Sequence, residues 1–249
     1  MCCFSQQVKR VSDTSIFCRM GSKGNQVVIY SMMLEANEDL AMILPIPVTD
    51  DRDESSVQFV DLSNYEKFFP MLDRAFPADN FGPFGATDSK KPKAMLSLKV
   101  ETVGSFDASF VPTRDDFDRL DERFRISSEI WDELPAYRDH GFVVFKLKAG
   151  NAHVHPMAFA FPAKDRNSLV FPTIHIHDGE IHEEAEFDHT LYCQADSSEV
   201  KMDWQESVAP LGRYINAPAA KGAVRGDEHV YKKQMVGAYP NEDVAVAAI

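Results

Sequence analysis

Two apolar runs near the amino terminus decide the fold, namely Gln26 to Glu35 (QVVIYSMMLE) and Asp39 to Val48 (DLAMILPIPV). Both are rich in β-branched and large apolar side chains, a composition typical of strands. A turn at Ala36-Asn37-Glu38 divides them, and Val57 to Leu62 continues the pattern. The sequence therefore predicts that the fold opens with a meander of neighbouring strands.

Short connections separate the strand-like runs that follow. Six more strands are predicted, at Ala94 to Val103, Phe142 to Lys148, Ala152 to Phe161, Leu169 to His177, Ala185 to Ala195 and His229 to Ala238. Short helices are expected from Ser63 onward, at Thr113 to Phe124 and at Ser128 to Leu134. Parallel strands need crossovers of about a dozen residues, so the short connections favour antiparallel pairing. The predicted fold class is mostly β, a β-rich α+β protein with antiparallel sheets or a sandwich and a few short helices.

The length of the chain bounds its domain organisation. A chain of 249 residues fits one β-rich domain over residues 1–249. The run Asn80 to Lys93 (NFGPFGATDSKKPK) holds two Gly and two Pro, which is typical of a loop. If the domain consists of two packed halves, this loop at residues 80–93 is the predicted boundary.

The charge of the chain narrows the classes of partner. With 26 basic and 39 acidic residues, the formal net charge is -13 with neutral His. This surplus of acid opposes binding to a phosphate backbone, so no nucleic acid partner is expected. No apolar run approaches the roughly 20 residues of a spanning helix, and the start MCCFSQQ resembles no secretory leader. We expect a cytoplasmic protein with no membrane partner.

The strongest chemical signal is a cluster of histidines. Six of the eight fall within 37 residues, and they are His153, His155, His175, His177, His182 and His189. In a strand, residues i and i+2 share a face, so each His-x-His run presents two imidazoles on one side. If residues 163–167 form a hairpin loop between the two strands, an even register places all four rings of the two runs on one face.

Such a face could hold a metal ion. The predicted ligands are His153, His155, His175 and His177, with Cys2 or Cys3 as an additional ligand. Imidazole and thiolate together suit copper or zinc, with iron as a third candidate cofactor. If the protein is an enzyme, the site would make it a metal-dependent hydrolase or oxidoreductase that uses activated water or dioxygen.

Two other interpretations remain open. Histidines in half-buried strands are often structural, and the acidic loop from 178 to 188 is more typical of a solvated hairpin than of a ligand set. The first alternative is a non-catalytic binding module, in which the Leu44-Pro45-Ile46-Pro47 strand edge and the Asn80 to Lys93 loop engage a protein, a peptide or a small molecule. The second is a hydrolase with Cys2 as an amino-terminal nucleophile.

The four cysteines make no disulfide framework in a chain of this length. Cys18 and Cys193 are each expected to be buried in the core, as small apolar residues. A reducing compartment would keep all four as thiols.

Several motifs also carry a resemblance. They are the early Cys2-Cys3-Phe4, the strand that ends in Leu44-Pro45-Ile46-Pro47, the Phe142 to Leu147 strand (FVVFKL) and the later Leu191-Tyr192. In this order they resemble an uncharacterised bacterial domain-of-unknown-function family with early cysteines, a Leu-Pro-x-Pro strand and a later Phe-x-x-x-Lys-Leu strand. The resemblance extends to about Asp196, and it implies the order of the strands but no activity.

Overall fold

The computed structural model describes residues 3–77, 101–104 and 106–249. In chain order the strands are β1 (Cys3–Phe4), β2 (Arg10–Met20), β3 (Asn25–Ala36), β4 (Leu40–Ile46), β5 (Gln58–Asp61), β6 (Glu101–Val103), β7 (Phe106–Val111), β8 (Gly141–Leu147), β9 (Gly150–Pro162), β10 (Ser168–Phe171), β11 (Glu184–Gln194), β12 (Gln205–Glu206), β13 (Tyr231–Pro240) and β14 (Val244–Ala247). The α-helices are α1 (Phe68–Asp73), α2 (Ser128–Asp132) and α3 (Ser198–Asp203). The 3₁₀ helices are η1 (Ser22–Gly24), η2 (Ser63–Tyr65), η3 (Arg114–Arg119), η4 (Glu122–Phe124), η5 (Pro135–Tyr137) and η6 (Leu211–Arg213). The predicted fold class is confirmed, since the chain is β-rich with a few short helices.

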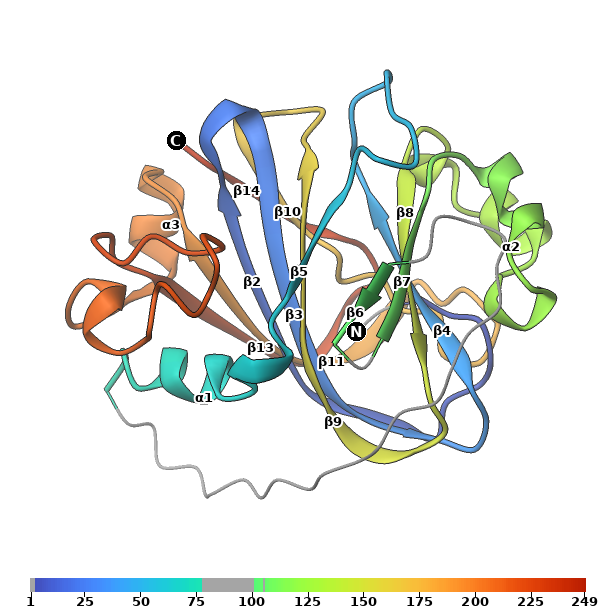
Figure 1. Cartoon of the computed structure of the whole chain (residues 1–249), viewed down its shortest axis with the longest axis horizontal. Helices are drawn as coiled ribbons and strands as arrows, with labels where there is room; N and C mark the ends of the chain where they lie inside the picture. The colour runs from blue at the N-terminus through green and yellow to red at the C-terminus, as the bar shows by residue number, and fades with distance from the viewer. Residues whose placement is uncertain (1–2, 78–100, 105) are drawn as a thin grey trace.

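Most strands belong to two sheets that lie face to face (Figure 1). One sheet has seven strands in the order β12-β13-β11-β2-β3-β9-β5, and the other has five in the order β1-β4-β8-β7-β6. β10 and β14 pair with each other in a small third sheet. Among the paired strands that the structure describes, β11 and β2 run parallel and the others antiparallel. The predicted antiparallel character therefore holds for all of these pairs but one.

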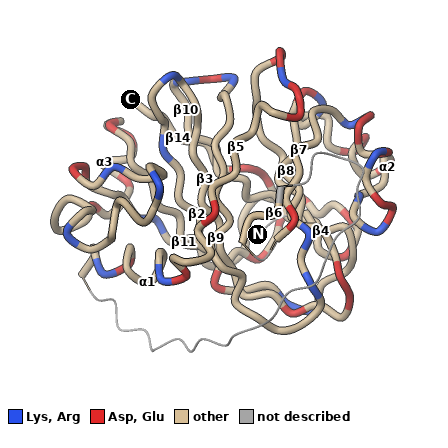
Figure 2. The backbone as a smooth tube through the Cα atoms, in the orientation of Figure 1, with Lys and Arg blue, Asp and Glu red and all other residues tan. Residues whose placement is uncertain are grey.

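The central strands are apolar on both faces, and each face packs against one of three apolar clusters. Strand β4, for example, is buried along its whole length. One apolar cluster fills the space between the two large sheets. A second lies between the seven-stranded sheet and a cover made of α1 and residues 208–230, and a third lies between the five-stranded sheet and α2 with the 3₁₀ helices beside it (Figure 1). The charged residues lie mainly on the loops and the outer elements (Figure 2).

The predicted opening meander is wrong. β3 pairs with β2 and β9 in the seven-stranded sheet, whereas β4 pairs with β1 and β8 in the five-stranded sheet. Both runs are apolar on two faces, and a strand of this kind needs cover on each side. The turn after Ala36 therefore carries the chain from one sheet to the facing sheet.

The predicted hairpin between β9 and β10 is also wrong. Both edges of β9 are occupied, by β3 and by β5, and β10 pairs with β14 instead. β10 ends at Phe171, just before Pro172, so the predicted strand from Leu169 to His177 is shorter than expected.

The other predicted elements agree in place but not always in type. The predicted helix at Thr113 to Phe124 is two 3₁₀ helices, η3 and η4. Thr113 and Asp116 form a capping box at the start of η3, in which the amide of Thr113 donates to Asp116 Oδ2 at 3.2 Å. The Asn80 to Lys93 loop, with the predicted domain boundary, and the first part of the Ala94 to Val103 strand lie outside the described residues. Within the described ranges, no helix is both long enough and apolar enough to cross a membrane.

Candidate functional site

The two His-x-His runs lie in different surroundings. His153 and His155 are on β9, where His153 is opposite Met33 of β3. His175 and His177 follow β10 and lie beside the amino-terminal segment, since the amide of Phe4 donates to the carbonyl of Ile176 at 2.9 Å. The two runs are therefore not on paired strands, and the predicted hairpin face with four rings does not form.

The rings on β9 make ordinary structural contacts. His153 Nε2 is 3.5 Å from the hydroxyl of Ser31. The ring of His155 packs on Phe106 with centroids 4.0 Å apart, and its Nδ1 is 3.2 Å from the carbonyl of Pro156. Burial lowers the pKa of both histidines, so both rings are neutral near pH 7.

His175, His177 and His189 form a stack of rings, here called the histidine stack. The centroid of His175 is 5.0 Å from that of His177 and 5.3 Å from that of His189. Phe187 packs on the stack at 4.5 Å from His175, and Phe4 contacts His177 at 5.5 Å. Burial lowers the pKa of His175 to about 2 and that of His177 to about 4. The stack is thus an aromatic part of the core in which the rings of His175 and His177 are uncharged near pH 7.

Two side chains near the carboxyl terminus hold the segment that carries the stack. Asn241 accepts from the amide of His175 at 2.7 Å and donates to its carbonyl at 3.0 Å. Asp243 Oδ1 accepts from the amides of Thr173 and Ile174, at 2.8 and 3.0 Å. These bonds satisfy the backbone amides of residues 173–175 and the carbonyl of His175, which would have bonded to β9 in the predicted hairpin. Neither residue is predicted from the sequence, because no local pattern marks a side chain that caps a segment about 70 positions away.

The three described cysteines lie in the apolar core. Cys3 is fully buried in the apolar cluster of the five-stranded sheet, with Ile174 and Ile176, whose side chains alternate with the histidines. Cys18 and Cys193 are fully buried too, as predicted, and burial raises the pKa of both thiols. Cys2 lies outside the described residues, so the nucleophile alternative stays a prediction.

The acidic loop offers one exposed group of polar side chains. Asp178, Glu180 and His182 each place a possible metal-ligand atom within 4.8 Å of the others, and within the described ranges no other three His, Cys, Asp or Glu side chains do so. His182 Nε2 is 3.0 Å from Asp178 Oδ2. All three are exposed, as the interpretation of a solvated loop predicts.

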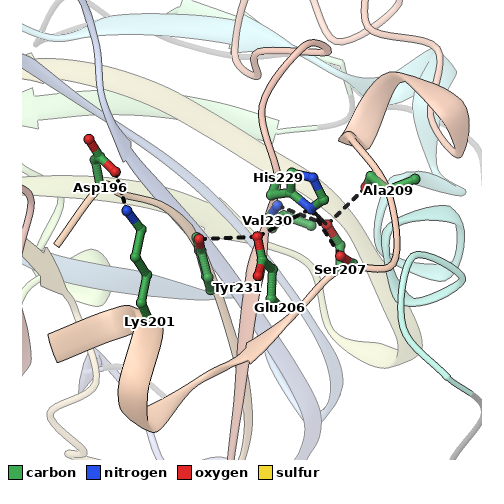
Figure 3. A network of polar contacts seen from close by, with 8 residues as sticks. All are labelled: Asp196, Lys201, Glu206, Ser207, Ala209, His229, Val230 and Tyr231. Carbon is green, nitrogen blue, oxygen red and sulfur yellow. Dashed lines mark hydrogen bonds and ion pairs between the residues drawn. The ribbon is translucent and has the colours of Figure 1, made fainter. Parts of the chain in front are cut away.

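Glu206 of β12 and the adjacent Ser207 also meet His229, which lies shortly before β13 (Figure 3). Ser207 Oγ is 3.2 Å from His229 Nδ1, and Glu206 Oε1 is 3.4 Å from the same nitrogen. In a nucleophilic triad the two ring nitrogens face the serine and the acid separately. Here Ser207 is buried, and its hydroxyl donates to the carbonyl of Ala209 and accepts from the amide of Val230. The group is a structural cap and not a catalytic triad.

Comparison with known proteins adds a likeness of fold. No protein-family model matches the chain. The crystal structure of baculovirus P35 is similar with a TM-score of 0.54 and 14% identity, over 100% of both chains. A mutated baculovirus P35 after caspase cleavage is similar with a TM-score of 0.51 and 16% identity, over 96% of this chain and 100% of that chain. The resemblance to a bacterial family stays a prediction.

The predicted metal-binding character of the chain is wrong. The structures with a similar fold are P35 proteins and not metal-binding proteins. The histidines serve the packing of the sheets instead, as ring stacks and backbone contacts. The shared hairpin face that was predicted to hold copper or zinc on His153, His155, His175 and His177, with Cys2 or Cys3 as an additional ligand, does not form, because β9 and β10 pair with other strands.

Proposed function

We propose that the chain is a non-catalytic binding protein whose partner is a protease of the caspase class. The observation that carries the proposal is the P35-like fold, which extends over the whole of both chains. A mutated P35 was solved after caspase cleavage, so a caspase acts on that protein. Because one fold can serve several functions, the proposal also needs a segment that a protease could engage.

The segment that we propose is the run Asn80 to Lys93, which belongs to the connection from α1 to β6. Its composition of Gly, Pro and short polar residues is typical of a connection that carries function. Caspases cut after aspartate, and Asp79 lies directly before this run and Asp88 within it. The proposal therefore assigns the recognised aspartate to one of these two positions.

The other surface predicted for a binding module, the Leu44-Pro45-Ile46-Pro47 strand edge, is not available to a partner. Leu44 and Ile46 are buried between the two sheets, and Pro45 pairs with Phe142 of β8. The Leu-Pro-Ile-Pro run is thus part of the core, and the proposal rests on the Asn80 to Lys93 segment alone.

The test is to mix the purified full chain with an active caspase at equal concentrations. Residual protease activity is followed with a fluorogenic peptide, and the chain is followed by intact mass. We expect loss of protease activity, together with a cut after Asp79 or Asp88 or a stable complex. Unchanged activity with no cut and no complex at micromolar concentrations would contradict the proposal.

Two substitutions in the connection from α1 to β6 separate recognition from general proteolysis. Asp88→Ala and Asp79→Ala form a matched pair, because both remove one carboxylate from the same connection. One of them should abolish the inhibition of the protease, and the other should leave the inhibition unchanged. An effect that survives in both single variants and in the double variant would show that the partner does not read this segment.

A further inference from the structure

Strand β13 has an edge that is open along most of its length. β11 pairs with it on one side from Tyr231 to Pro240. On the other side β12 pairs only with Tyr231 and Lys232. Among the described residues, no strand pairs with the outer side of residues 233–240. A strand edge of this kind is a template for another extended chain.

The direction of the backbone groups follows from the pairing with β12. The carbonyl of Val230 accepts from the amide of Ser207 at 2.9 Å, so the backbone groups of residue 230 point away from β11. These groups alternate along an antiparallel strand, so those of Gln234, Val236 and Ala238 also point outward. They offer both donors and acceptors to an added strand.

The centre of this edge lacks the devices that usually block strand addition. Edges are commonly protected by Lys, by Pro or by short length. On β13 the lysines are at its start, and Pro240 is at its end. Lys232 is buried against Asp73, and Lys233 lies over the ring of Trp204. Between them the strand is uncharged, and the side chain of Val236 is 71% exposed.

Strand β11, which pairs with β13, makes the surroundings of this edge acidic. Glu184, Glu186 and Asp188 of β11 are exposed, and they pair in register with Pro240, Ala238 and Val236. Cross-strand partners share a face of the sheet, so the three carboxylates stand beside the exposed side chains of β13. Strands are about 4.8 Å apart, which puts side chains of an added strand about 10 Å from these acids, within reach of a lysine or arginine.

We propose that the open edge of β13 binds an extended basic peptide segment of a partner protein, which adds as an eighth strand to the seven-stranded sheet. The backbone would supply the hydrogen bonds, Val236 an apolar contact, and the acids of β11 the preference for Lys or Arg. A second copy of this chain fits less well, because two chains of net charge -13 would bring the same acidic strands together. This surface is made of other residues than the segment assigned to a caspase.

The test uses the full chain and a labelled seven-residue peptide of alternating Lys and Val. A matched peptide carries Glu in place of Lys, and binding is measured by fluorescence anisotropy at low and high salt. We expect saturable binding of the basic peptide, weakened by salt, and none of the acidic one. Two N-methylated basic peptides block alternate sets of amides, so one should lose binding and the other should keep it. Equal loss in both would overturn strand addition.

Two lysine substitutions locate the surface. Val236→Lys places a positive charge at the centre of the edge and should weaken binding at least tenfold. Val208→Lys is the matched control, since Val208 is 68% exposed but lies outside β13, and it should leave binding unchanged. Equal effects of the two variants would overturn the proposal. A dimer of the chain in sedimentation that Val236→Lys dissociates would overturn it too, because the occupant would then be a second copy.

The acids are tested in the same way. The double substitution Glu186→Gln and Asp188→Asn should weaken the binding of the basic peptide and make that binding less dependent on salt. Glu129→Gln, an exposed acid of α2 on the far side of the other sheet, is the control and should change neither. Circular dichroism of each variant shows that it has folded. A double variant that folds and binds as tightly as the parent would remove the charge preference.

Discussion

The imidazole ring of His175 lies parallel to that of His177, with centroids 5.0 Å apart and ring planes at 9°. Two neutral rings stack at this distance, whereas two charged rings would repel each other. His175 is only 5% exposed, and burial keeps the pKa of both rings far below its ordinary value. The packing of this part of the core therefore requires uncharged histidines.

The folded chain should lose stability as the pH falls through 6.5. The pKa of a histidine is about 6.5 in the unfolded chain. It is about 2 for His175 and about 4 for His177 in the folded chain, because both rings are buried. Below pH 6.5 the unfolded chain therefore binds protons that the folded chain does not, and each such histidine lowers stability by up to about 1.4 kcal/mol per pH unit. Urea unfolding between pH 7.5 and 5.5 measures the slope.

One buried acid opposes this trend at lower pH. Burial raises the pKa of Asp243 to about 6, so the folded chain takes up this proton first as the pH falls from 6 toward 4. The histidine effect is therefore clearest above pH 6. His175→Phe should flatten the slope there, since it keeps an aromatic ring in the stack. His182→Gln should not flatten the slope. The hydrogen bond with Asp178 raises the pKa of this exposed histidine, so it does not contribute to the loss of stability at low pH. An unchanged slope in His175→Phe would contradict the assignment.

Removal of Asp73 should destabilise the chain through Lys232. The buried Nζ of Lys232 is 3.2 Å from Asp73 Oδ1 and 5.0 Å from the centroid of Phe76, and Tyr192 donates to the same carboxylate. Asp73→Ala would leave the ammonium without this partner. The carboxylate is 59% exposed, so solvent moderates the cost to about 1–2 kcal/mol, measured by urea unfolding.

Two further variants check this prediction. Lys232→Met in the Asp73→Ala background should restore most of the stability, because no buried charge then remains. Asp196→Ala breaks the exposed pair with Lys201, which solvent screens, and should change the free energy of unfolding far less than Asp73→Ala does. If Asp73→Ala costs no more than Asp196→Ala, the buried ammonium has found another partner.

Gly141→Ala should overpack the core between the sheets. A Cβ atom at Gly141 would lie 2.5 Å from Cε2 of Phe110 and 3.0 Å from Cγ1 of Val48. Overpacking of this kind costs about 1–3 kcal/mol, which denaturant unfolding would detect. Phe110→Leu in the same chain should recover part of the loss, since the two residues share the space. Strictly additive losses would mean that a different contact is responsible.

Ser207 should behave as a structural residue. Ser207→Ala removes the acceptor for the amide of Val230 and the donor to the carbonyl of Ala209, at a cost of about 1–2 kcal/mol. The parent chain should not react with a fluorophosphonate probe at Ser207, because its hydroxyl is buried and engaged. A covalent adduct on this serine, seen by peptide mass mapping, would contradict the structural role.

The sequence predicts the strands well and their pairing poorly, for physical reasons. A run such as Leu40 to Ile46 forms a strand in almost any β fold, because its side chains are apolar throughout. The same uniformity removes the alternation that would show which sheet it joins. The two His-x-His runs show why pairing is hard to predict. Their spacing predicts a shared face, but their surroundings depend on β5, β14 and the side chain of Asn241, which are distant in sequence.

The parallel pairing of β2 with β11 has a consequence for the synthesis of the chain. β2 lies between β3, which follows it directly, and β11, whose residues Glu184–Gln194 are translated much later. A ribosome that has released the β2–β3 hairpin has therefore not yet made the strand that covers its other edge. Non-local closure of this kind slows folding and leaves a nascent chain exposed to aggregation. We expect the seven-stranded sheet to close only after nearly the whole chain has left the ribosome.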